Sequence, residues 1–335
     1  MKLARLFLNR GALVAWTAGV LVSCTGCFAI LPSGFLSGFV LEPDATCADL
    51  AARLALGTFP SVGSPAEANL QFEYFSVQSA NGQTLSGWFI PAQLDGALEP
   101  APLGTVLIMH GTSGPISCTL PWALAAVNNR MHAVVFDYQG YGQSTGEADI
   151  ATQLDDADAV LNWIVADPAD ARQKVHLLGV SLGTGPALGL PALRSRPQLQ
   201  TVALDGAFDA ETMVVAIESQ VNSIFPLFGV SARLAFTWLF EARSRLGEVM
   251  IPAMFLTAEL DNVTPPSGAQ ALYALVGSPQ KSSWLFGGLN HVQPLFYLEK
   301  QYVSLLVTFW RDPSMAPSPD AADSDPTIHV PSFSL

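Results

Sequence analysis

The sequence is poor in basic residues, and it lacks the motifs of the common metal sites. Lysine and arginine together account for 15 of the 335 residues against 28 acidic residues, the net charge is -13, and no basic cluster occurs beyond the first ten residues. Nucleic-acid binders carry a basic patch that neutralises phosphates, so we expect no nucleic-acid partner. The single C-x-x-C pair has no matching second pair and no H-E-x-x-H motif occurs, so we expect no metal and no cofactor.

The few basic residues near the start of the chain indicate a targeting segment. Lys2, Arg5 and Arg10 precede an uncharged, mostly apolar stretch over residues 11–22. A basic region followed by an apolar region and small residues is typical of a secretory signal peptide. We therefore expect residues 1–23 to be a signal peptide.

The residues that end this stretch, Leu21-Val22-Ser23-Cys24, resemble the lipobox of bacterial lipoproteins. The resemblance implies cleavage before Cys24, lipid attachment to that cysteine, and an exported protein held on the cell membrane or the outer membrane. Membrane lipid is then a partner. An uncleaved transmembrane anchor remains the alternative, because the apolar residues continue through Phe28-Ala29-Ile30-Leu31 and the whole run is about long enough to span a bilayer.

Export changes how the other cysteines are interpreted. An oxidising compartment permits disulfides. If Cys24 carries lipid, then Cys27, Cys47 and Cys118 remain, and three cysteines allow at most one internal disulfide. Its connectivity cannot be deduced, and free or buried thiols without a catalytic role are an equally good interpretation.

The rest of the chain divides into a leader, one large domain and a tail. Residues 24–65, interrupted by Gly, Pro and Ser, are expected to be a lipid-anchored leader or linker. Residues 66–311 are expected to form the domain, with a helical, aromatic-rich cap over about 209–249. Residues 312–335 are rich in Pro, Ser, Ala and Asp, and we expect a disordered tail.

Within the domain, buried-strand patterns alternate with helical patterns. Asn81-Gly82 between two alternating runs predicts a β-hairpin. The alternation that follows predicts a mostly parallel, doubly wound sheet with helices on both faces. Pro191 should kink or shorten the helix that contains it. The predicted strands cover residues 72–77, 85–90, 105–109, 133–136, 175–178, 201–204, 253–256 and 283–286, and the predicted helices cover 121–128, 151–165, 182–194, 268–276 and 294–310.

The most informative motif is G-x-S-x-G over Gly179-Val180-Ser181-Leu182-Gly183. It follows a strand pattern and precedes a helix pattern, which places Ser181 on a sharp turn with strained backbone angles. The two glycines remove Cβ atoms that would clash around that turn. The motif alone can arise by chance, so its surroundings must decide.

Those surroundings resemble the α/β-hydrolase family over roughly residues 72–310. Ligands of open α/β sheets bind at the carboxyl ends of strands, and the predicted strands end in polar loops there. Ser181, Asp261 and His291 occur in the family's order, each on the expected loop. The D-Y-x-G-Y-G-x-S loop is most similar to serine-aminopeptidase-like, monoglyceride-lipase-like and BEM46-type hydrolases. Gln139 stands where those relatives usually have Arg.

The resemblance implies a complete acyl-transfer site. Ser181 would be the nucleophile, His291 the general base, and Asp261 the acid that orients the imidazole. Backbone N–H groups of Thr112 and Leu182 would form the oxyanion hole.

Other residues compete for some of these roles. Asp205 also ends a strand, and Glu259 and Asp209 are further candidates for the acid. Asp137 is better explained as an anchor for its loop. Among the other histidines, His110 is interpreted as loop-shaping; the remaining three, His132, His176 and His329, lie before a strand, within a strand and in the tail.

We therefore expect a serine hydrolase that cleaves carboxylic esters or related small acyl compounds through an acyl-enzyme. A serine exopeptidase on the same fold is one alternative, and it would need a cap carboxylate such as Glu211, Glu218 or Glu241 to bind the substrate's amino group. A membrane-tethered binding protein that kept the fold and lost the activity is the other.

Overall fold

The computed structural model describes residues 21–23, 28–30, 33–38, 40–53, 63–224, 229–230, 233 and 235–331. Cys24 and most of the expected signal peptide lie outside these residues. Within the described ranges, no helix combines the length and the apolar character needed to cross a membrane.

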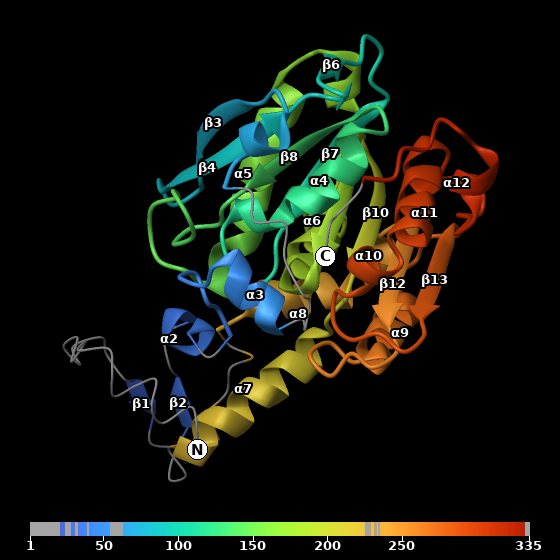
Figure 1. The fold of residues 1–335 in the computed structure, drawn as a ribbon. Coiled ribbons are helices and arrows are strands. Elements are labelled where there is room, and N and C mark those ends of the chain that lie inside the picture. Colours follow the sequence, from blue (N-terminus) through green and yellow to red (C-terminus); the bar gives the residue numbers. More distant parts are fainter. Residues whose placement is uncertain are drawn as a thin grey trace.

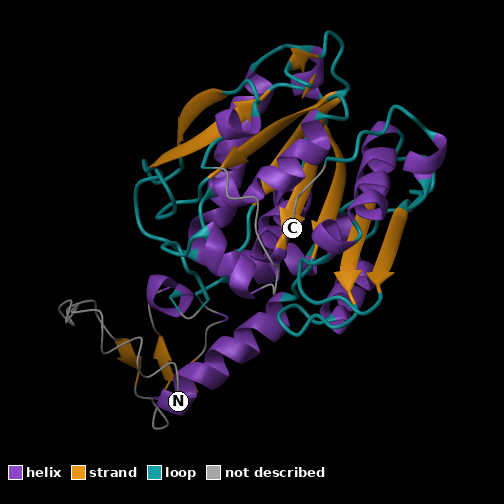
Figure 2. Ribbon diagram, viewed as in Figure 1, coloured by secondary structure: helices purple, strands orange, loops and turns teal. Residues whose placement is uncertain are grey.

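A sheet of eight strands forms the centre of the molecule (Figures 1 and 2). Its order is β13-β12-β10-β9-β7-β8-β4-β3, and all neighbours from β13 to β8 are parallel. The hairpin β3–β4 adds two antiparallel strands at one edge. The predicted mostly parallel α/β sheet is thus confirmed. The strands are β3 (Glu73–Gln78), β4 (Thr84–Ile90), β7 (Gly104–Met109), β8 (Met131–Phe136), β9 (Val175–Val180), β10 (Leu199–Asp205), β12 (Ala253–Ala258) and β13 (Lys281–Phe286).

Short strands lie outside this sheet. Two of them form a hairpin, and three form a small sheet that joins the N-terminal segment to the cap region. The hairpin comprises β5 (Gln93–Leu94) and β6 (Ala97–Leu98), and the small sheet comprises β1 (Leu21–Ser23), β2 (Phe28–Ile30) and β11 (Gly229–Val230).

Helices cover both faces of the large sheet, because successive strand side chains point to opposite sides. On β7, Leu107 and Met109 pack into one core with α5, α6, α8 and α9, while Val106 and Ile108 pack into the other core with α4, α10 and α11. The helices are α2 (Ser33–Ser37), α3 (Cys47–Arg53), α4 (Leu120–Val127), α5 (Gln153–Ala166), α6 (Thr184–Leu193), α7 (Ala210–Ile224), α8 (Thr237–Ser244), α9 (Pro266–Leu275), α10 (Pro294–Tyr297), α11 (Glu299–Arg311) and α12 (Ala321–Ser324).

Two helices differ from their predicted extents. α6 contains Pro191 and ends at Leu193, as expected for a proline that removes a hydrogen bond from the last turn. The predicted helix over 294–310 is divided at Leu298, whose backbone leaves the helical region and separates α10 from α11. Short 3₁₀ helices occur at η1 (Pro65–Ala68), η2 (Ile116–Thr119), η3 (Ile150–Thr152), η4 (Asp170–Gln173), η5 (Ser181–Gly183) and η7 (Leu246–Glu248).

The N-terminal segment, expected to be only a leader, packs against the large domain. A disulfide joins Cys47, at the start of α3, to Cys118 in η2, with the two Cα atoms 5.3 Å apart. On α2, Ser37 donates a hydrogen bond to Asp149 over 2.9 Å. The arrowheads of β12 and β13 point toward the end of the sheet where α2, α3 and α7 lie (Figure 1). This segment therefore contributes to the surface that carries the carboxyl ends of the strands.

The C-terminal segment also differs from the expectation of disorder over its described residues. Its backbone at His329 exchanges two hydrogen bonds with the Asn129 side chain, over 2.7 and 2.8 Å. Ile328 is buried against the core that holds α11. Burial of Ile328 and the two hydrogen bonds from Asn129 offset the loss of conformational entropy when this polar stretch becomes ordered.

Candidate active site

The motif over residues 179–183 forms the turn that the sequence predicts. Ser181 follows β9 directly, begins η5, and has a φ of 53°, a left-handed conformation that is rare outside glycine. A Cβ on Gly179 would lie 2.5 Å from the carbonyl oxygen of Gly183, and one on Gly183 would lie 2.1 Å from the Met109 carbonyl oxygen. Only glycine fits at these two positions, so the strained turn depends on them.

Three predicted site residues form one hydrogen-bonded chain. Ser181 Oγ lies 2.8 Å from His291 Nε2, and His291 Nδ1 lies 2.7 Å from Asp261 Oδ2. They come from the loops after β9, β13 and β12. All three are buried, with exposed fractions of 8%, 9% and 4%. With Nδ1–H donating to the carboxylate, Nε2 is left to accept the serine proton.

The local structure holds Asp261 as an ionised carboxylate. Its Oδ1 accepts from the backbone N–H groups of Val263 and Thr264, over 2.9 and 2.8 Å, and the Thr264 hydroxyl donates to Oδ2 over 2.8 Å. Burial alone would raise the pKa, but the hydrogen bond and charge of His291 and the Thr264 donors hold the Asp261 pKa below its ordinary value. An ionised Asp261 favours the His291 tautomer that carries its proton on Nδ1 and leaves Nε2 free to accept.

The three competing carboxylates are engaged elsewhere. Asp205 accepts from Tyr302 and Trp122, over 2.7 and 3.3 Å. Burial raises its pKa to about 6, although Tyr302 and the nearby His291 oppose that shift. Asp209 forms an ion pair with Arg243 (2.6 Å), and Glu259 accepts from the Gly288 N–H (2.8 Å).

The two predicted oxyanion-hole residues lie beside Ser181. Leu182 follows it in η5, and Thr112 lines the same cavities as Ser181. Gly111 packs so closely that a Cβ there would lie 3.1 Å from the Cβ of Ser181. Backbone N–H groups in this arrangement can stabilise an oxyanion.

His110 shapes the loop around Thr112, as expected, and Asp137, expected to anchor its own loop, accepts from the Gln143 N–H of that loop over 3.4 Å. His110 Nδ1 donates to the Gly111 carbonyl over 2.9 Å, and burial lowers its pKa to about 4, so the ring stays neutral. Asp137 accepts from the Ile116 N–H over 2.9 Å. Burial raises the Asp137 pKa to about 6, against the effect of its backbone donors. Neither side chain bonds directly to Ser181 or His291 in the described structure.

Gln139, at the position where similar hydrolases usually have Arg, joins a hydrogen-bond network through an uncharged amide. Its Nε2 donates to Asp156 Oδ1 (2.5 Å) and to Ser79 Oγ (3.2 Å), and its Oε1 accepts from Asn81 (2.7 Å). Burial raises the pKa of Asp156 in spite of these donors. The network ties the β3–β4 hairpin to the loop after β8, so the amide supplies a structural link without a buried cation.

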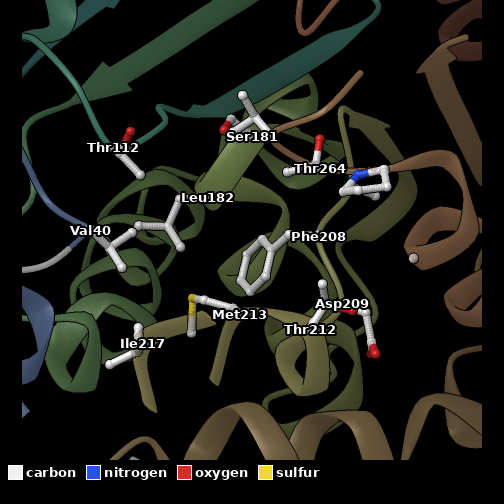
Figure 3. A pocket seen from close by; sticks show the side chains of 14 residues that line it. Val40, Thr112, Ser181, Leu182, Phe208, Asp209, Thr212, Met213, Ile217 and Thr264 are labelled. Atoms are coloured by element: carbon white, nitrogen blue, oxygen red, sulfur yellow. The ribbon is translucent and has the colours of Figure 1, made fainter. Parts of the chain in front are cut away.

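Two cavities meet at Ser181. The first, of about 190 Å³, lies beneath α7, and we call it the α7 cavity. Figure 3 shows Leu182 and Phe208 between Ser181 and the side chains of Met213 and Ile217. The second, of about 410 Å³, lies between the Thr112 loop and the His291 loop, and we call it the His291 cavity. A substrate centred on Ser181 can therefore extend in two directions.

Several residues of this site were missed at the sequence level. Thr264, which contacts both Asp261 and His291, lies three residues after the acid, and its hydroxyl was a signal that could have been used. Val40 and Leu50 line the two cavities, yet nothing in their local pattern distinguishes them from a linker. Met213 and Ile217 follow helical spacing on α7, which does not tell a cavity wall from a core.

The chain matches the model of the alpha/beta hydrolase family over residues 106–330, and it therefore belongs to that family. Among curated relatives, protein bem46 of Schizosaccharomyces pombe is 24% identical over 239 residues, which cover 70% of this chain and 76% of that protein. The uncharacterized protein YfhR of Salmonella typhimurium is 27% identical over 269 residues, covering 76% and 87%. The esterase Pf2001 of Pyrococcus furiosus has the same fold, with a TM-score of 0.60 and 15% identity over 74% of this chain and 95% of that one.

Proposed function

We propose that the protein is a serine hydrolase that cleaves carboxylic esters through a covalent acyl-enzyme. The observation that carries this proposal is the continuous chain from Ser181 Oγ through His291 to Asp261, with contacts of 2.8 and 2.7 Å. A hydroxyl is a weak nucleophile unless a neighbouring base accepts its proton. The position of Ser181 on a strained turn, open to two cavities, supports the same role.

In the acylation step, Ser181 Oγ adds to the ester carbonyl carbon while its proton passes to His291 Nε2. The carbonyl oxygen becomes an oxyanion held by the N–H groups of Thr112 and Leu182. The bond to the alcohol oxygen then breaks as His291 gives that oxygen its proton. The alcohol leaves, and the acyl group stays on Ser181.

In the second step, water replaces the alcohol. His291 removes one proton from water as the oxygen adds to the acyl carbon, and it returns that proton to Ser181 Oγ as the acyl bond breaks. One ester and one water are consumed, and one carboxylic acid and one alcohol are released. Asp261 stabilises the imidazolium that forms in both steps.

Labelling with a fluorophosphonate and hydrolysis of 4-nitrophenyl hexanoate test this function together. We expect Ser181→Ala to lose the label and to lower kcat by about 10⁴ or more. Ser283→Ala, at an exposed serine of the edge strand β13, is the matched control and should keep both the label and the native kcat. A label that persists in Ser181→Ala, or no label on the native protein, would support the alternative of a binding protein without catalysis.

The exopeptidase alternative lacks support from the described cap residues. None of the three carboxylates considered for amino-group recognition, Glu211, Glu218 and Glu241, is among the described residues that line the two cavities, and Glu211 pairs with Arg233 over 3.0 Å. Asp209 does line the α7 cavity, but Arg243 neutralises it. We expect aminoacyl 4-nitroanilides to be hydrolysed at least a hundredfold more slowly than 4-nitrophenyl hexanoate. Comparable rates would favour the peptidase.

We further propose that the protein is exported and held on a membrane by lipid on Cys24. The Cys47–Cys118 disulfide supports an oxidising compartment. Cys24→Ser should abolish incorporation of a labelled fatty acid and release the protein from the membrane fraction. If the native protein and Cys24→Ser both stay in the membrane fraction and neither incorporates the labelled fatty acid, the result would instead favour an uncleaved apolar anchor.

A further inference from the structure

The two cavities at Ser181 differ in size and in their relation to His291. His291 lines the larger one, together with Asn290 and Gln293 of its own loop. The described residues that line the α7 cavity include Leu182 and Phe208 but not His291. The leaving alcohol must come within hydrogen-bond reach of His291 Nε2 to receive its proton. The alcohol therefore belongs in the His291 cavity, and the acyl chain is left with the α7 cavity.

We propose that the preferred substrates are esters of a short-to-medium linear acyl group, of about six carbons, with a larger alcohol. This inference rests on the proposed function. An apolar cavity of about 150 Å³ holds a benzene-sized guest of six carbons. The α7 cavity measures about 190 Å³, whereas the His291 cavity measures about 410 Å³. The smaller acyl group thus occupies the α7 cavity, and the larger alcohol group occupies the His291 cavity.

The wall of the α7 cavity suits an aliphatic chain. Leu182 and Ile217 are almost fully buried, with exposed fractions of 3% and 1%, and Met213 and Phe208 are half-buried. Asp209 also lines this cavity, but its negative charge is balanced by Arg243, which forms an ion pair with it over 2.6 Å. Each methylene buried in such a place should raise kcat/KM about fourfold until the cavity is full.

A pair of isomeric esters separates this proposal from a simple preference for hydrophobic substrates. Decyl hexanoate and hexyl decanoate have the same formula and the same ester chemistry, but they exchange the long and the short chain. We expect decyl hexanoate to be hydrolysed at least about tenfold faster, since a ten-carbon acyl chain exceeds the α7 cavity. The measurement is kcat/KM in mixed detergent micelles of fixed composition.

Two substitutions on α7 provide the matched variants. Met213→Ala enlarges the end of the α7 cavity farther from Ser181, so the optimum acyl length should increase and the difference between the two isomers should shrink. Val215→Ala lies on the same helix at a side chain that is 62% exposed, and it should leave the acyl-length profile unchanged. Circular dichroism and fluorophosphonate labelling check that both variants are folded and reactive.

The possible failures are distinguishable. Equal rates for the isomers, or faster cleavage of hexyl decanoate, would overturn the size assignment while leaving the hydrolase proposal intact. An acyl-length profile of Met213→Ala that matches the native profile would also overturn the size assignment and leave the hydrolase proposal intact. Absence of fluorophosphonate labelling and of any ester hydrolysis would refute the proposed function itself.

A second observation concerns the N-terminal segment and the loop that carries Thr112. The Glu42 N–H donates to the Thr112 carbonyl over 2.8 Å, and the Ser113 hydroxyl donates to the Glu42 carboxylate over 2.7 Å. The Cys47–Cys118 disulfide then closes the same segment onto the end of that loop, across 71 residues of sequence. The Thr112 loop is therefore held by a segment from outside the hydrolase core.

We infer that the Cys47–Cys118 disulfide is a positioning element for the oxyanion hole. On its other side, the Thr112 carbonyl accepts from the Tyr141 hydroxyl over 2.9 Å, so the peptide after Thr112 is clamped between the core and Glu42. Loss of one oxyanion donor typically costs about 10²–10³ in kcat. Loss of the disulfide should misplace the donor rather than remove it, and we expect about a tenfold decrease in kcat with KM changed by less than about twofold.

Reduction of the native protein with dithiothreitol tests this positioning role. Peptide mapping confirms that the disulfide is open, and the affinity for a trifluoromethyl ketone, which mimics the oxyanion, should weaken in parallel with kcat. Cys47→Ala should show the low kcat from the start and should not respond to the reductant. An unchanged kcat after verified reduction, or an effect on KM and Tm alone, would show that the disulfide only stabilises the fold.

Discussion

Two buried aspartates lie at the carboxyl ends of the neighbouring parallel strands β10 and β12, and the protein shifts their pKa values in opposite directions. Asp261, after β12, accepts four hydrogen bonds from His291, Val263 and Thr264 donors, which hold its pKa below the ordinary value against burial. Asp205, at the end of β10, lies among Tyr302 and Trp122, and burial raises its pKa to about 6. Both residues are aspartates near the carboxyl ends of adjacent strands, but Asp205 is the last residue of β10 whereas Asp261 lies in the loop after β12. The donors that each position supplies to the carboxylate therefore decide its role.

The difference comes from backbone geometry. The loop after Asp261 turns two N–H groups onto one carboxylate oxygen, as an Asx turn does. Asp205 instead faces the core that contains α4 and α11, where its donors are side chains from distant parts of the sequence. We infer that Asp261 is the ionised carboxylate that orients and stabilises His291 during catalysis. Asp205 instead stabilises the packing of α4 and α11 through Trp122 and Tyr302.

The largest expected effect is that of Asp261→Asn. An amide at this position disfavours the Nδ1–H tautomer that leaves Nε2 free to act as a base, and kcat should fall by about 10⁴. Stopped-flow hydrolysis of 4-nitrophenyl hexanoate, with the fold checked by circular dichroism, gives the measurement. A decrease of less than about tenfold would mean that His291 is oriented by another group.

The next effect concerns stability. Tyr302→Phe removes the hydroxyl that donates to Asp205 over 2.7 Å and accepts from Trp122 over 3.0 Å, so a buried carboxylate loses a partner. We expect the free energy of unfolding in urea at neutral pH to fall by about 1–3 kcal/mol. Tyr74→Phe, at a side chain that is 63% exposed, serves as the control and should stay within about 0.5 kcal/mol.

Asp205→Asn tests whether the second buried aspartate also contributes to catalysis. Because Asp205 makes no direct bond to His291 in the described structure, kcat should fall by no more than about tenfold. The same substrate and conditions as for Asp261→Asn make the two variants directly comparable. Equal losses in the two variants would contradict the division of roles between the two carboxylates.

The smallest effect is a pH-dependent difference in stability between the native protein and Asp205→Asn. The folded-state pKa of about 6 lies above the ordinary value of 3.8, so the folded protein binds more protons between these values. Relative to Asp205→Asn, the native protein should lose stability as the pH rises toward and through about 6, by roughly 2–4 °C in Tm. Differential scanning calorimetry at several pH values measures the difference.

Subtracting the variant from the native protein isolates Asp205. Burial lowers the pKa of His110 and His132 to about 4 and that of His176 to about 3, and these groups contribute with the opposite sign, increasing stability as the pH rises. Their contributions cancel in the difference. A difference in Tm that is constant with pH would contradict the raised pKa of Asp205.

Much of the fold and of the hydrogen-bonded chain from Ser181 to Asp261 could be predicted from short stretches of sequence. The strand–turn–helix around Ser181 is determined by local sterics, since Gly179 and Gly183 are the residues that allow the backbone to pass so closely. Strand and helix periodicity predicted the parallel sheet, and a parallel sheet brings the ends of its strands to one edge. With only five histidines to choose from, elimination together with position after the last predicted strand selected His291.

The tertiary structure alone decided the choices that depend on packing between distant segments. The sequence favoured Asp261 as the acid but did not exclude Asp205, because both come at the end of a predicted strand and the donors around each carboxylate are set by the fold. It also left open which cysteines pair, and it predicted a leader where Cys47 and Glu42 in fact hold the Thr112 loop. Side-chain directions and long-range contacts carry no short-range pattern, so the two cavities at Ser181 became visible only once α7 and the N-terminal segment were placed against the sheet.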